Sequence, residues 1–335
     1  MPITFSVLGS GAWGTAIAIL LASRPHHRVR LWSARAETGR ALSHDRENVR
    51  LLPGVLIPDS VILTEDVAEA VDAADFWVSA VPTVHLRATM HRVRAKGGSP
   101  PAVVSLTKGI EIGTFARPSQ ILTEVLGTAN VVVLSGPSHA EEVSRGLPTS
   151  VVAASADESL AVAVQQYFST DRFRVYSNLD PVGVELAGAL KNVMGLAAGI
   201  CDGLGYGDNA RAALMTRGLA EITRFGVAFG AEPATFAGLA GLGDLITTCV
   251  SPHGRNRAVG LRLGQGEKLD AILSSMNQVA EGVTTTKAVY ERAMLSGLDL
   301  PICTEAYRVL YEQKPPVEAV TALMGRSPKG EQWPR

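Results

Sequence analysis

Lys191 and Asp244 are charged residues in surroundings where ionised groups are rare. Lys191 lies in the apolar stretch 182–200, whose only other charged residue is Glu185, and Asp244 stands among small and apolar residues in 241–248. Burying an unpaired ammonium is costly, so Lys191 must pair, reach solvent or take part in a reaction. Desolvation also lowers the pKa of a lysine toward the range useful for proton transfer. Lys191 is therefore a candidate acid–base residue. The alternatives are a lysine whose head group reaches solvent and an aspartate that caps a helix.

Two further polar segments follow apolar runs of strand length. Lys108 follows the run 102–106 after one intervening residue, and the turn 135–140 follows another such run. The carboxyl ends of parallel strands line the ligand crevice, so both segments are candidates for substrate contact. The turn could present backbone N–H groups and the Ser138 hydroxyl to an anion or a carbonyl group. The alternatives are a solvated lysine and a simple strand-to-helix turn.

Arg255 and Asn256 stand just before the helical stretch 258–263. Cations together with the free amides of a helix N-terminus make a phosphate site. The alternative is a solvated basic loop. Glu281 precedes another helix, and there the alternative to a functional role is a capping charge.

Gly9, Gly11 and Gly14 form a Gly-x-Gly-x-x-Gly motif between the apolar run 3–8 and a helical stretch that reaches about Ser23. This is the context in which such a motif binds a dinucleotide. The first glycine permits the tight turn, the second lets the backbone approach a pyrophosphate, and the third lets the helix pack closely on the strand. We therefore predict dinucleotide binding. The alternative is a glycine-rich turn without a ligand.

The acidic residue that would bind the ribose 2′-hydroxyl about 20 residues further on is missing. The second strand ends in Leu-Trp-Ser-Ala-Arg at 31–35, and the first acid after it is Glu37. Without a carboxylate to repel a 2′-phosphate, and with Arg35 able to pair with one, NADPH use is expected. The alternative is that Arg35 is a solvated charge at the start of a helix.

Short apolar strands separated by helical segments predict a mostly parallel sheet in the first half of the chain. The expected strands are 3–8, 29–32, 61–64, 76–80, 102–106, 131–134, 150–153 and 173–176, with helical segments such as 83–95 and 140–145 between them.

The pattern changes at 178–181. Beyond Pro181 we find helical periodicity without a convincing strand, over 182–200, 210–229, 284–296 and 303–313. We therefore predict an α/β fold with a Rossmann-type, mostly parallel sheet domain over 1–180 that binds a dinucleotide. An all-helical, substrate-binding domain follows over 181–325, and a polar, flexible tail over 326–335.

The composition narrows the class of ligand. The chain has 335 residues, of which 46% are hydrophobic and 19% charged, and its formal net charge is -1. A near-neutral chain lacks the excess positive charge that binds nucleic acid or an anionic membrane surface. An anionic ligand must therefore bind to a local cluster of cations. No apolar run approaches the roughly 18 residues of a membrane span. Cysteines are few and no metal-ligand spacing occurs, so we expect a cytoplasmic protein with neither disulfides nor a metal site and without membrane insertion.

Taken together, these segments resemble the bacterial NAD(P)-dependent glycerol-3-phosphate dehydrogenases. The resemblance covers nearly the whole chain, with several long motifs in the same order. They are GSGAWGT at 9–15, LPG at 52–54, VSLTKGIE at 104–111, SGPSHAEE at 135–142, ALKNV at 189–193, GLGDLITTC at 241–249, GRNR at 254–257 and VAEGV at 279–283.

The resemblance implies reversible reduction of dihydroxyacetone phosphate, a triose phosphate, to sn-glycerol 3-phosphate for glycerophospholipid synthesis. On the matching positions, Lys191 is the implied catalytic residue, which protonates the carbonyl oxygen as hydride arrives and deprotonates the alcohol in reverse. The other positions implied to bind substrate are Lys108, Gly136, Ser138, Asp244, Gly254, Arg255 and Asn256, with the phosphate held by Arg255 and Asn256.

The implied cofactor is NAD or NADP, and a homodimer is expected. The positions implied to bind the cofactor are Gly9, Gly11, Ala12, Trp13, Gly14, Arg35, Lys108, Ala140, Arg255, Val279 and Glu281. The chain departs from the family pattern at two positions. Leu51 replaces the usual tyrosine before LPG, which puts one cofactor contact in doubt. Gly254 replaces the usual serine before RN, so any contact there must come from backbone.

Two other readings remain open from the sequence. A β-hydroxyacid or ketopantoate reductase also combines a Gly-x-Gly-x-x-Gly motif with a lysine in a helical domain, although GRNR and GLGDLITTC favour a phosphate-bearing substrate. A catalytically dead NAD(P)-sensing protein would not need Lys108, Lys191 and Asp244 together. Turnover of NAD(P)H with dihydroxyacetone phosphate, compared with the other ketones, separates the three.

Replacing Arg35 tests the cofactor prediction. Arg35→Ala should raise KM for NADPH more than KM for NADH, because only NADPH carries the 2′-phosphate with which the guanidinium would pair. Steady-state kinetics with each cofactor measure both constants. Equal effects on the two would remove the proposed role of Arg35.

Overall fold

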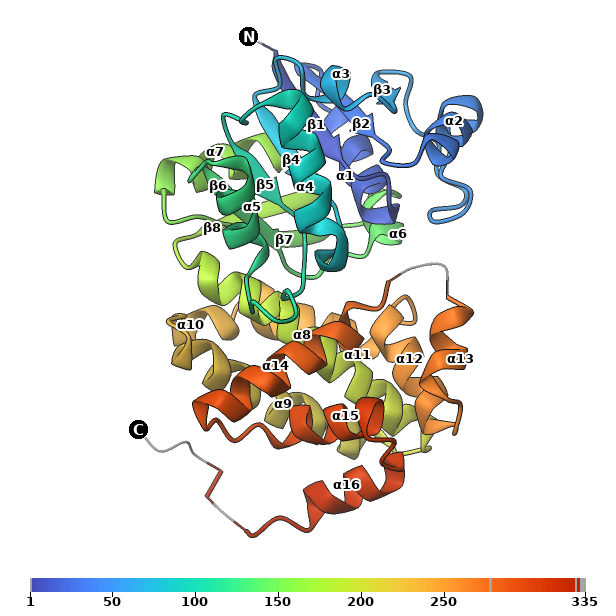
Figure 1. The fold of residues 1–335 in the computed structure, drawn as a ribbon, viewed down its shortest axis with the longest axis vertical. Coiled ribbons are helices and arrows are strands. Elements are labelled where there is room, and N and C mark those ends of the chain that lie inside the picture. The colour runs from blue at the N-terminus through green and yellow to red at the C-terminus, as the bar shows by residue number, and fades with distance from the viewer. Residues whose placement is uncertain (1, 277–278, 329, 332–335) are drawn as a thin grey trace.

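A computed structural model describes residues 2–276, 279–328 and 330–331. The chain forms a layered sheet region with a cluster of helices beneath it (Figure 1). Within the described residues, all strands precede residue 180 and only helices follow it, as predicted. The expected flexible tail over 326–335 lies partly outside the described residues, at 329 and 332–335.

Eight strands form one sheet in the order β3-β2-β1-β4-β5-β6-β7-β8. Their bounds are β1 Ile3–Leu8, β2 His27–Trp32, β3 Val61–Thr64, β4 Phe76–Ser79, β5 Val103–Ser105, β6 Val131–Ser135, β7 Thr149–Ala154 and β8 Phe173–Asn178. The first six strands pair in parallel, β7 runs antiparallel to β6, and β8 is parallel to β7. The prediction of a mostly parallel Rossmann-type sheet is thus confirmed.

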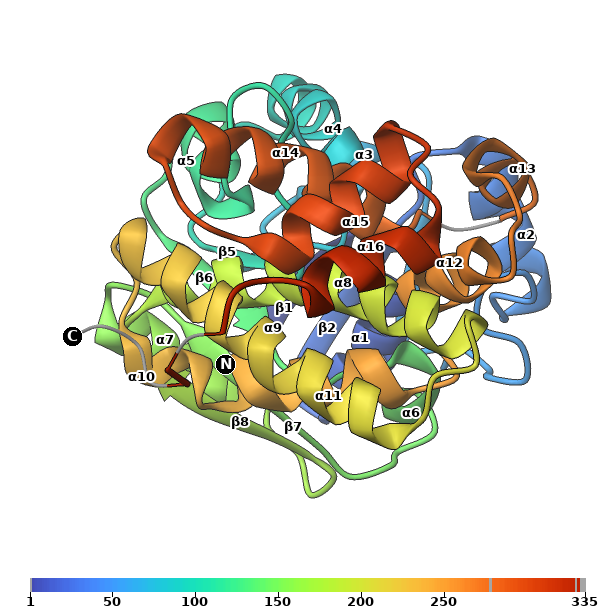
Figure 2. The ribbon, with the colours of Figure 1, turned by 90° about the horizontal axis from the view of Figure 1, so that it is seen from below.

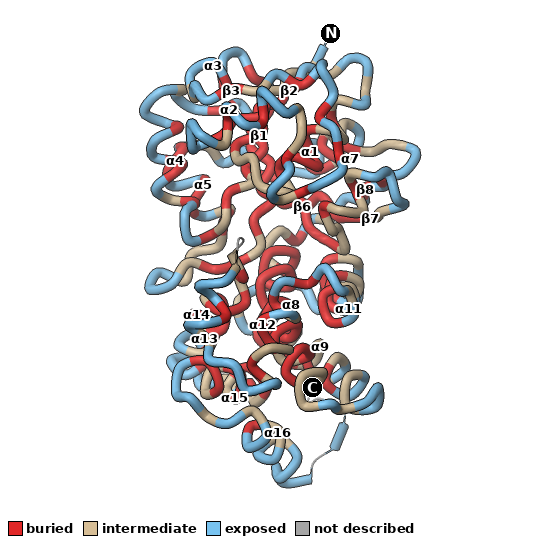
Figure 3. Tube along the Cα trace, turned by 90° about the vertical axis from the view of Figure 1, so that its right-hand side faces the viewer, coloured by how far each residue is buried: buried red, intermediate tan, exposed pale blue. Residues whose placement is uncertain are grey.

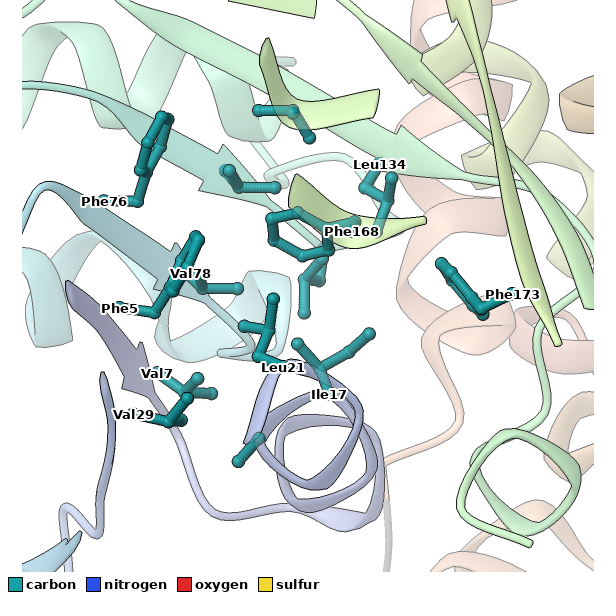
Figure 4. Close-up of a cluster of buried hydrophobic side chains, with 14 of the residues drawn as sticks. Phe5, Val7, Ile17, Leu21, Val29, Phe76, Val78, Leu134, Phe168 and Phe173 are labelled. Carbon is teal, nitrogen blue, oxygen red and sulfur yellow. The ribbon is translucent and has the colours of Figure 1, made fainter. Parts of the chain in front are cut away.

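Helices cover both faces of this sheet, so its strands are apolar on both sides. On one face, Ile17 and Leu21 of α1 and Phe168 of α7 pack against Phe5 and neighbouring strand residues (Figure 4). The other face is covered by α3, α4 and α5. The helices of this half are α1 Ala12–Ala22, α2 Ala36–Asp45, α3 Val67–Val71, α4 Thr83–Gly97, α5 Pro118–Leu126, α6 Ala140–Val143 and α7 Glu158–Phe168.

The helical half is built around α8, Pro181–Gly203, which contacts α9, α11, α12, α14 and α15 (Figure 2). Asp180 caps its N-terminus by accepting the N–H of Gly183 at 2.8 Å, and Pro181 occupies the first turn, where a missing N–H costs nothing. The remaining elements are α9 Asp208–Ala228, α10 Pro233–Phe236, the π-helical turn η1 Leu239–Gly243, α11 Asp244–Val250, α12 Arg255–Gly264, α13 Leu269–Ser274, α14 Glu281–Ser296, α15 Pro301–Tyr311 and α16 Pro316–Met324.

Two helical segments, 181–203 and 233–250, are long and apolar enough to cross a membrane by length and composition. The expectation that no apolar run approaches that length was therefore wrong. In the first segment, which is α8, 94% of the most apolar window is buried inside the protein (Figure 3). Packing within the protein accounts for the apolar character of α8. The second segment comprises α10, η1 and α11 and is 44% buried.

Glycines let α8 and α12 approach each other at backbone distance. A Cβ atom at any of four positions would overlap backbone atoms of the facing helix, and these positions are Gly199, Gly203, Gly260 and Gly264. Because α12 begins at Arg255, this close packing also fixes where that residue stands relative to α8.

Gly260→Ala should therefore destabilise the protein. The added methyl meets the carbonyl oxygen of Leu196, and overpacking of this kind costs about 1–3 kcal/mol of unfolding free energy. Urea unfolding followed by circular dichroism measures the change. Gly207→Ala is the matched control, because a Cβ there meets nothing within 4 Å. Equal stability of the two variants would contradict the tight helix contact.

Candidate active site

The side chains of Lys108, Lys191 and Asp244 meet where the sheet and the helical half join. Asp244, the first residue of α11, accepts the Lys191 ammonium on Oδ1 at 2.5 Å and the Lys108 ammonium on Oδ2 at 2.8 Å. Asp244 is 1% exposed and Lys191 is 7% exposed. The two lysines come from opposite sides of the junction, since Lys108 follows β5 and Lys191 lies within α8. Lys191 therefore does not reach solvent, and Lys108 is held by a carboxylate rather than by water alone.

Burial and neighbouring charges set the protonation of this cluster. Desolvation, reinforced by the positive charges of Lys108 and Arg255, lowers the pKa of Lys191 to about 8, although Asp244 acts in the opposite direction. Burial alone would raise the pKa of Asp244, but the two ammonium groups outweigh it and the pKa falls below its usual value. The carboxylate is therefore ionised at neutral pH, and Lys191 is close to its titration midpoint.

Gly136 and Ser138 complete the surroundings of the Lys108 ammonium. The ammonium donates to the Gly136 carbonyl at 2.8 Å and lies 3.4 Å from Ser138 Oγ, while the Ser138 hydroxyl itself donates to the Gly136 carbonyl at 2.8 Å. Gly136 has φ +129°, a conformation that a side chain would strain. The turn after β6 thus faces the lysine–aspartate cluster rather than solvent.

A chain of side-chain amides joins this cluster to the GRNR turn. Asn192 donates to the Lys108 carbonyl at 3.1 Å, Asn256 donates to Asn192 Oδ1 at 2.9 Å, and Asn256 Oδ1 accepts the N–H of Gly282 at 2.9 Å. Asn192 was not singled out from the sequence, although its amide lies beside Lys191 in the most apolar helix. Asn256 is buried, and its side-chain oxygen already accepts the Gly282 N–H. Its N–H₂ group has two hydrogens and donates one of them to Asn192, so one donor is left.

Arg255 lies at the N-terminus of α12, with Gly254 at the N-cap and no side-chain cap on the helix. Its side chain is exposed and donates to the Val279 carbonyl at 3.3 Å. Glu281, two residues further on, accepts the backbone N–H of Thr83 at 2.8 Å. The guanidinium and the free first-turn amides therefore stand together at the edge of the cluster, which is the arrangement that binds a phosphate.

The glycine-rich turn has the shape that a dinucleotide requires. Gly9 has φ +117°, and a Cβ at Gly14 would overlap the Gly9 carbonyl. A Cβ at Gly11, by contrast, would meet nothing within 4 Å, so this backbone stands open. Gly11 is also the N-cap of α1, where no side chain satisfies the free N–H groups. A half-buried backbone with room beside it, at a helix N-terminus without a side-chain cap among the described residues, fits a pyrophosphate.

Asn48 holds this turn in place, and sequence reasoning missed it. Its buried amide donates to the Ser10 carbonyl and to Thr15 Oγ1, each at 3.0 Å. Ser33 donates to Ser10 Oγ at 2.7 Å from the end of β2. A signal was present, because Asn48 stands four residues before the LPG motif, but the bonds depend on a fold that brings 48 beside 10–15.

Three further predicted cofactor positions, Ala12, Trp13 and Ala140, lie around the same turn. Ala12 and Trp13 pack in a small apolar cluster with Leu52 and Ala140, and the indole N–H of Trp13 is buried without a partner among the described residues. Leu52 is fully buried there, whereas Leu51 is only half-buried. Arg35 lies apart from the lysine–aspartate cluster, exposed at the N-cap of α2 and two residues beyond Ser33.

Comparison with known proteins gives one family across the chain. Residues 4–161 match the family model for the N-terminus of NAD-dependent glycerol-3-phosphate dehydrogenase, and residues 180–321 match that for its C-terminus. Relatives named NAD(P)+-dependent glycerol-3-phosphate dehydrogenase occur in Geobacillus thermodenitrificans, at 53% identity over 97% of this chain and 96% of that one, and in Chlorobium phaeobacteroides, at 50% identity over 97% and 98%.

The crystal structure of glycerol-3-phosphate dehydrogenase from Coxiella burnetii has a TM-score of 0.92 to this chain, at 35% identity, with 97% of this chain and 99% of that one covered. The sequence resemblance is therefore confirmed over both halves of the molecule. The chain belongs to the NAD-dependent glycerol-3-phosphate dehydrogenase family.

Proposed function

We propose that this protein catalyses the reversible NAD(P)H-dependent reduction of dihydroxyacetone phosphate to sn-glycerol 3-phosphate, which supplies glycerophospholipid synthesis. The observation that carries the proposal is the Lys191–Asp244–Lys108 cluster at the junction of the two halves, in a chain that also has a dinucleotide-type turn and a cationic helix N-terminus. When bound, the nicotinamide cofactor supplies or accepts the hydride. The protein must then orient the ketone and move one proton.

Lys191 is the proposed proton donor and acceptor at the reacting oxygen. Its ammonium carries the proton in the direction of reduction, and a pKa of about 8 lets it release that proton near working pH. Asp244 holds the ammonium in place at 2.5 Å through its ionised carboxylate. A positioned acid–base group of this kind is typically worth about 10²–10⁴ in rate.

The substrate is proposed to bind between the two faces of the junction. Lys108, with Gly136 and Ser138 around it, would contact the carbonyl end, while Arg255 and the free N–H of Asn256 would bind the phosphate. Gly254 can contribute only its backbone N–H. Binding a phosphate that takes no part in the reaction converts remote affinity into orientation of the ketone.

The residues proposed to hold NAD(P)H surround the glycine-rich turn and its approaches. Gly9, Gly11 and Gly14 shape the pyrophosphate site and Arg35 would pair with a 2′-phosphate. The other proposed contacts come from Ala12, Trp13, Lys108, Ala140, Arg255, Val279 and Glu281.

We further propose a dinucleotide-binding domain over 1–180, a substrate-binding domain over 181–325 and a cytoplasmic homodimer without membrane insertion. The gap between β8, which ends at Asn178, and α8, which begins at Pro181, supports the domain boundary. A net charge of -1 supports a small anionic substrate rather than nucleic acid.

A direct assay tests the proposed reaction. Loss of NADPH absorbance is followed with dihydroxyacetone phosphate, ketopantoate and a β-keto acid as alternative substrates. We expect turnover with the phosphate-bearing ketone alone, because the other two ketones carry a carboxylate and no phosphate to place at the cationic helix N-terminus. Preference for either of the other ketones, or no turnover, would contradict the proposal.

Asp244→Asn should be strongly destabilising at neutral pH. The buried Lys191 and the half-buried Lys108 ammonium groups then lose their counter-charge, which costs about 3–5 kcal/mol of unfolding free energy. Asp244 raises the pKa of Lys191, so removing its charge lowers that pKa further below the unfolded value, and the variant regains stability with rising pH earlier than the wild type does. Urea unfolding at pH 7 and pH 9 should show a smaller loss at the higher pH. Asp208→Asn, at an exposed carboxylate, is the control, and equal losses would contradict the coupling.

Lys191→Ala should lower kcat by about 10²–10⁴-fold while the Kd for NADPH changes less than about threefold, because only the proton transfer is removed. In the wild type, kcat/KM for reduction should fall above pH 8 and that for oxidation should rise through the same pH. Stopped-flow fluorescence and steady-state kinetics measure these quantities. Lys287→Ala, at a half-buried lysine of α14 that lies 4.0 Å from Glu291, serves as control. Turnover by Lys191→Ala above a tenth of the wild-type rate would rule out the acid–base role.

A further inference from the structure

One hydrogen bond links the first turns of two helices from the two halves of the molecule. Glu281, the first residue of α14, directs its carboxylate at the first turn of α4, where Oε1 accepts the N–H of Thr83 at 2.8 Å. The first-turn amides of a helix have no partner within the helix and carry a partial positive charge. The contact therefore places the Glu281 carboxylate of the helical half at the N-terminus of α4 in the sheet half, where the helix dipole favours a negative charge.

Gly109 makes room for this contact. A Cβ at that position would overlap both Thr83 Oγ1 and Glu281 Oε2, so only glycine leaves the two side chains where they are. Gly109 directly follows Lys108, whose ammonium binds Asp244. The link between α4 and α14 thus lies against the segment that carries one of the clustered lysines.

The Glu281 carboxylate keeps unused hydrogen-bonding capacity. Oε2 is buried and makes no hydrogen bond among the described residues, and the same holds for Thr83 Oγ1. Burial raises the pKa of Glu281, although the Thr83 N–H and the positive charge of Arg255 act in the opposite direction. A buried carboxylate oxygen without a donor is costly, and a ligand hydroxyl would satisfy it.

We propose that Thr83 is a positioning residue for the dinucleotide site. Its backbone N–H fixes Glu281 Oε1, which leaves Oε2 free to accept a hydroxyl group of bound NAD(P)H. This inference rests on the proposed role of Glu281 as a cofactor contact. The bond also ties α14 to α4, so cofactor affinity depends on how closely the two halves are joined.

Thr83→Pro removes the N–H without disturbing the helix, and Thr83→Ala is its matched control. Proline is well tolerated as the first helical residue, and Pro82 before it already has the extended conformation that a following proline requires. Loss of a hydrogen bond to a charged group should raise the Kd for NADPH about 10- to 100-fold in Thr83→Pro. Thr83→Ala keeps the N–H and should stay within about threefold of the wild type.

Two measurements separate positioning from a general loss of structure. NADPH fluorescence titration gives Kd, and hydrogen exchange of the amides in 281–285 should speed up in Thr83→Pro but not in Thr83→Ala. The kcat at saturating NADPH should stay within about twofold in both variants, because the lysine–aspartate cluster is intact. Wild-type Kd in folded Thr83→Pro would overturn the inference and leave the proposed reaction standing. Failure of the wild type to bind NADPH would overturn both.

Gly109→Ala decides the matter if Thr83→Pro does not fold. Its methyl group should push Thr83 and Glu281 apart, and the Kd for NADPH should rise as it does for Thr83→Pro. A wild-type Kd in Gly109→Ala would equally overturn the inference.

Discussion

The carboxylate of Asp244, shared by two lysine ammonium groups, is the interaction on which the site depends. An unpaired ammonium at the depth of Lys191 would lose its proton, because burial disfavours the charged form. With one carboxylate between two cations, the cluster keeps a net positive charge. The electrostatic result is a firmly ionised acid and a Lys191 whose pKa falls to about 8. A group with that pKa can both give and take a proton near neutral pH.

The fold brings these three residues together from separate elements. Lys108 needs the carboxyl end of β5, Lys191 needs the core of α8, and Asp244 needs the first turn of α11. The glycine contacts between α8 and α12 then set the GRNR turn beside Asn192, and the amide chain reaches from there to the start of α14. Because each link crosses between elements, the lysine–aspartate cluster and the GRNR turn form one unit.

Residues with a strong local signal were predictable from the sequence, and residues defined by long-range contacts were not. The eight strands follow from short apolar runs, and Lys191 stands out because an apolar helix surrounds it. Asn192 and Thr83 carry no such signal, and Asn48 has only its place near the LPG motif, since their roles depend on partners from 33 to 198 residues away. The polar helix α2 buries only Gly39 and Leu42, so it leaves little periodicity to detect. For α8 the sequence predicted the helix correctly. The apolar composition of this helix is explained only by its packing inside the protein, which the structure shows.

An NMR titration of Lys191 tests the central claim most directly. The ¹³Cε chemical shift of the lysine side chains can be followed against pH, with the Lys191 signal assigned through a Lys191→Arg variant. The shared carboxylate and the burial of the cluster predict a midpoint near pH 8 for Lys191. A midpoint near 10.4, the value of a solvated lysine, would contradict the account.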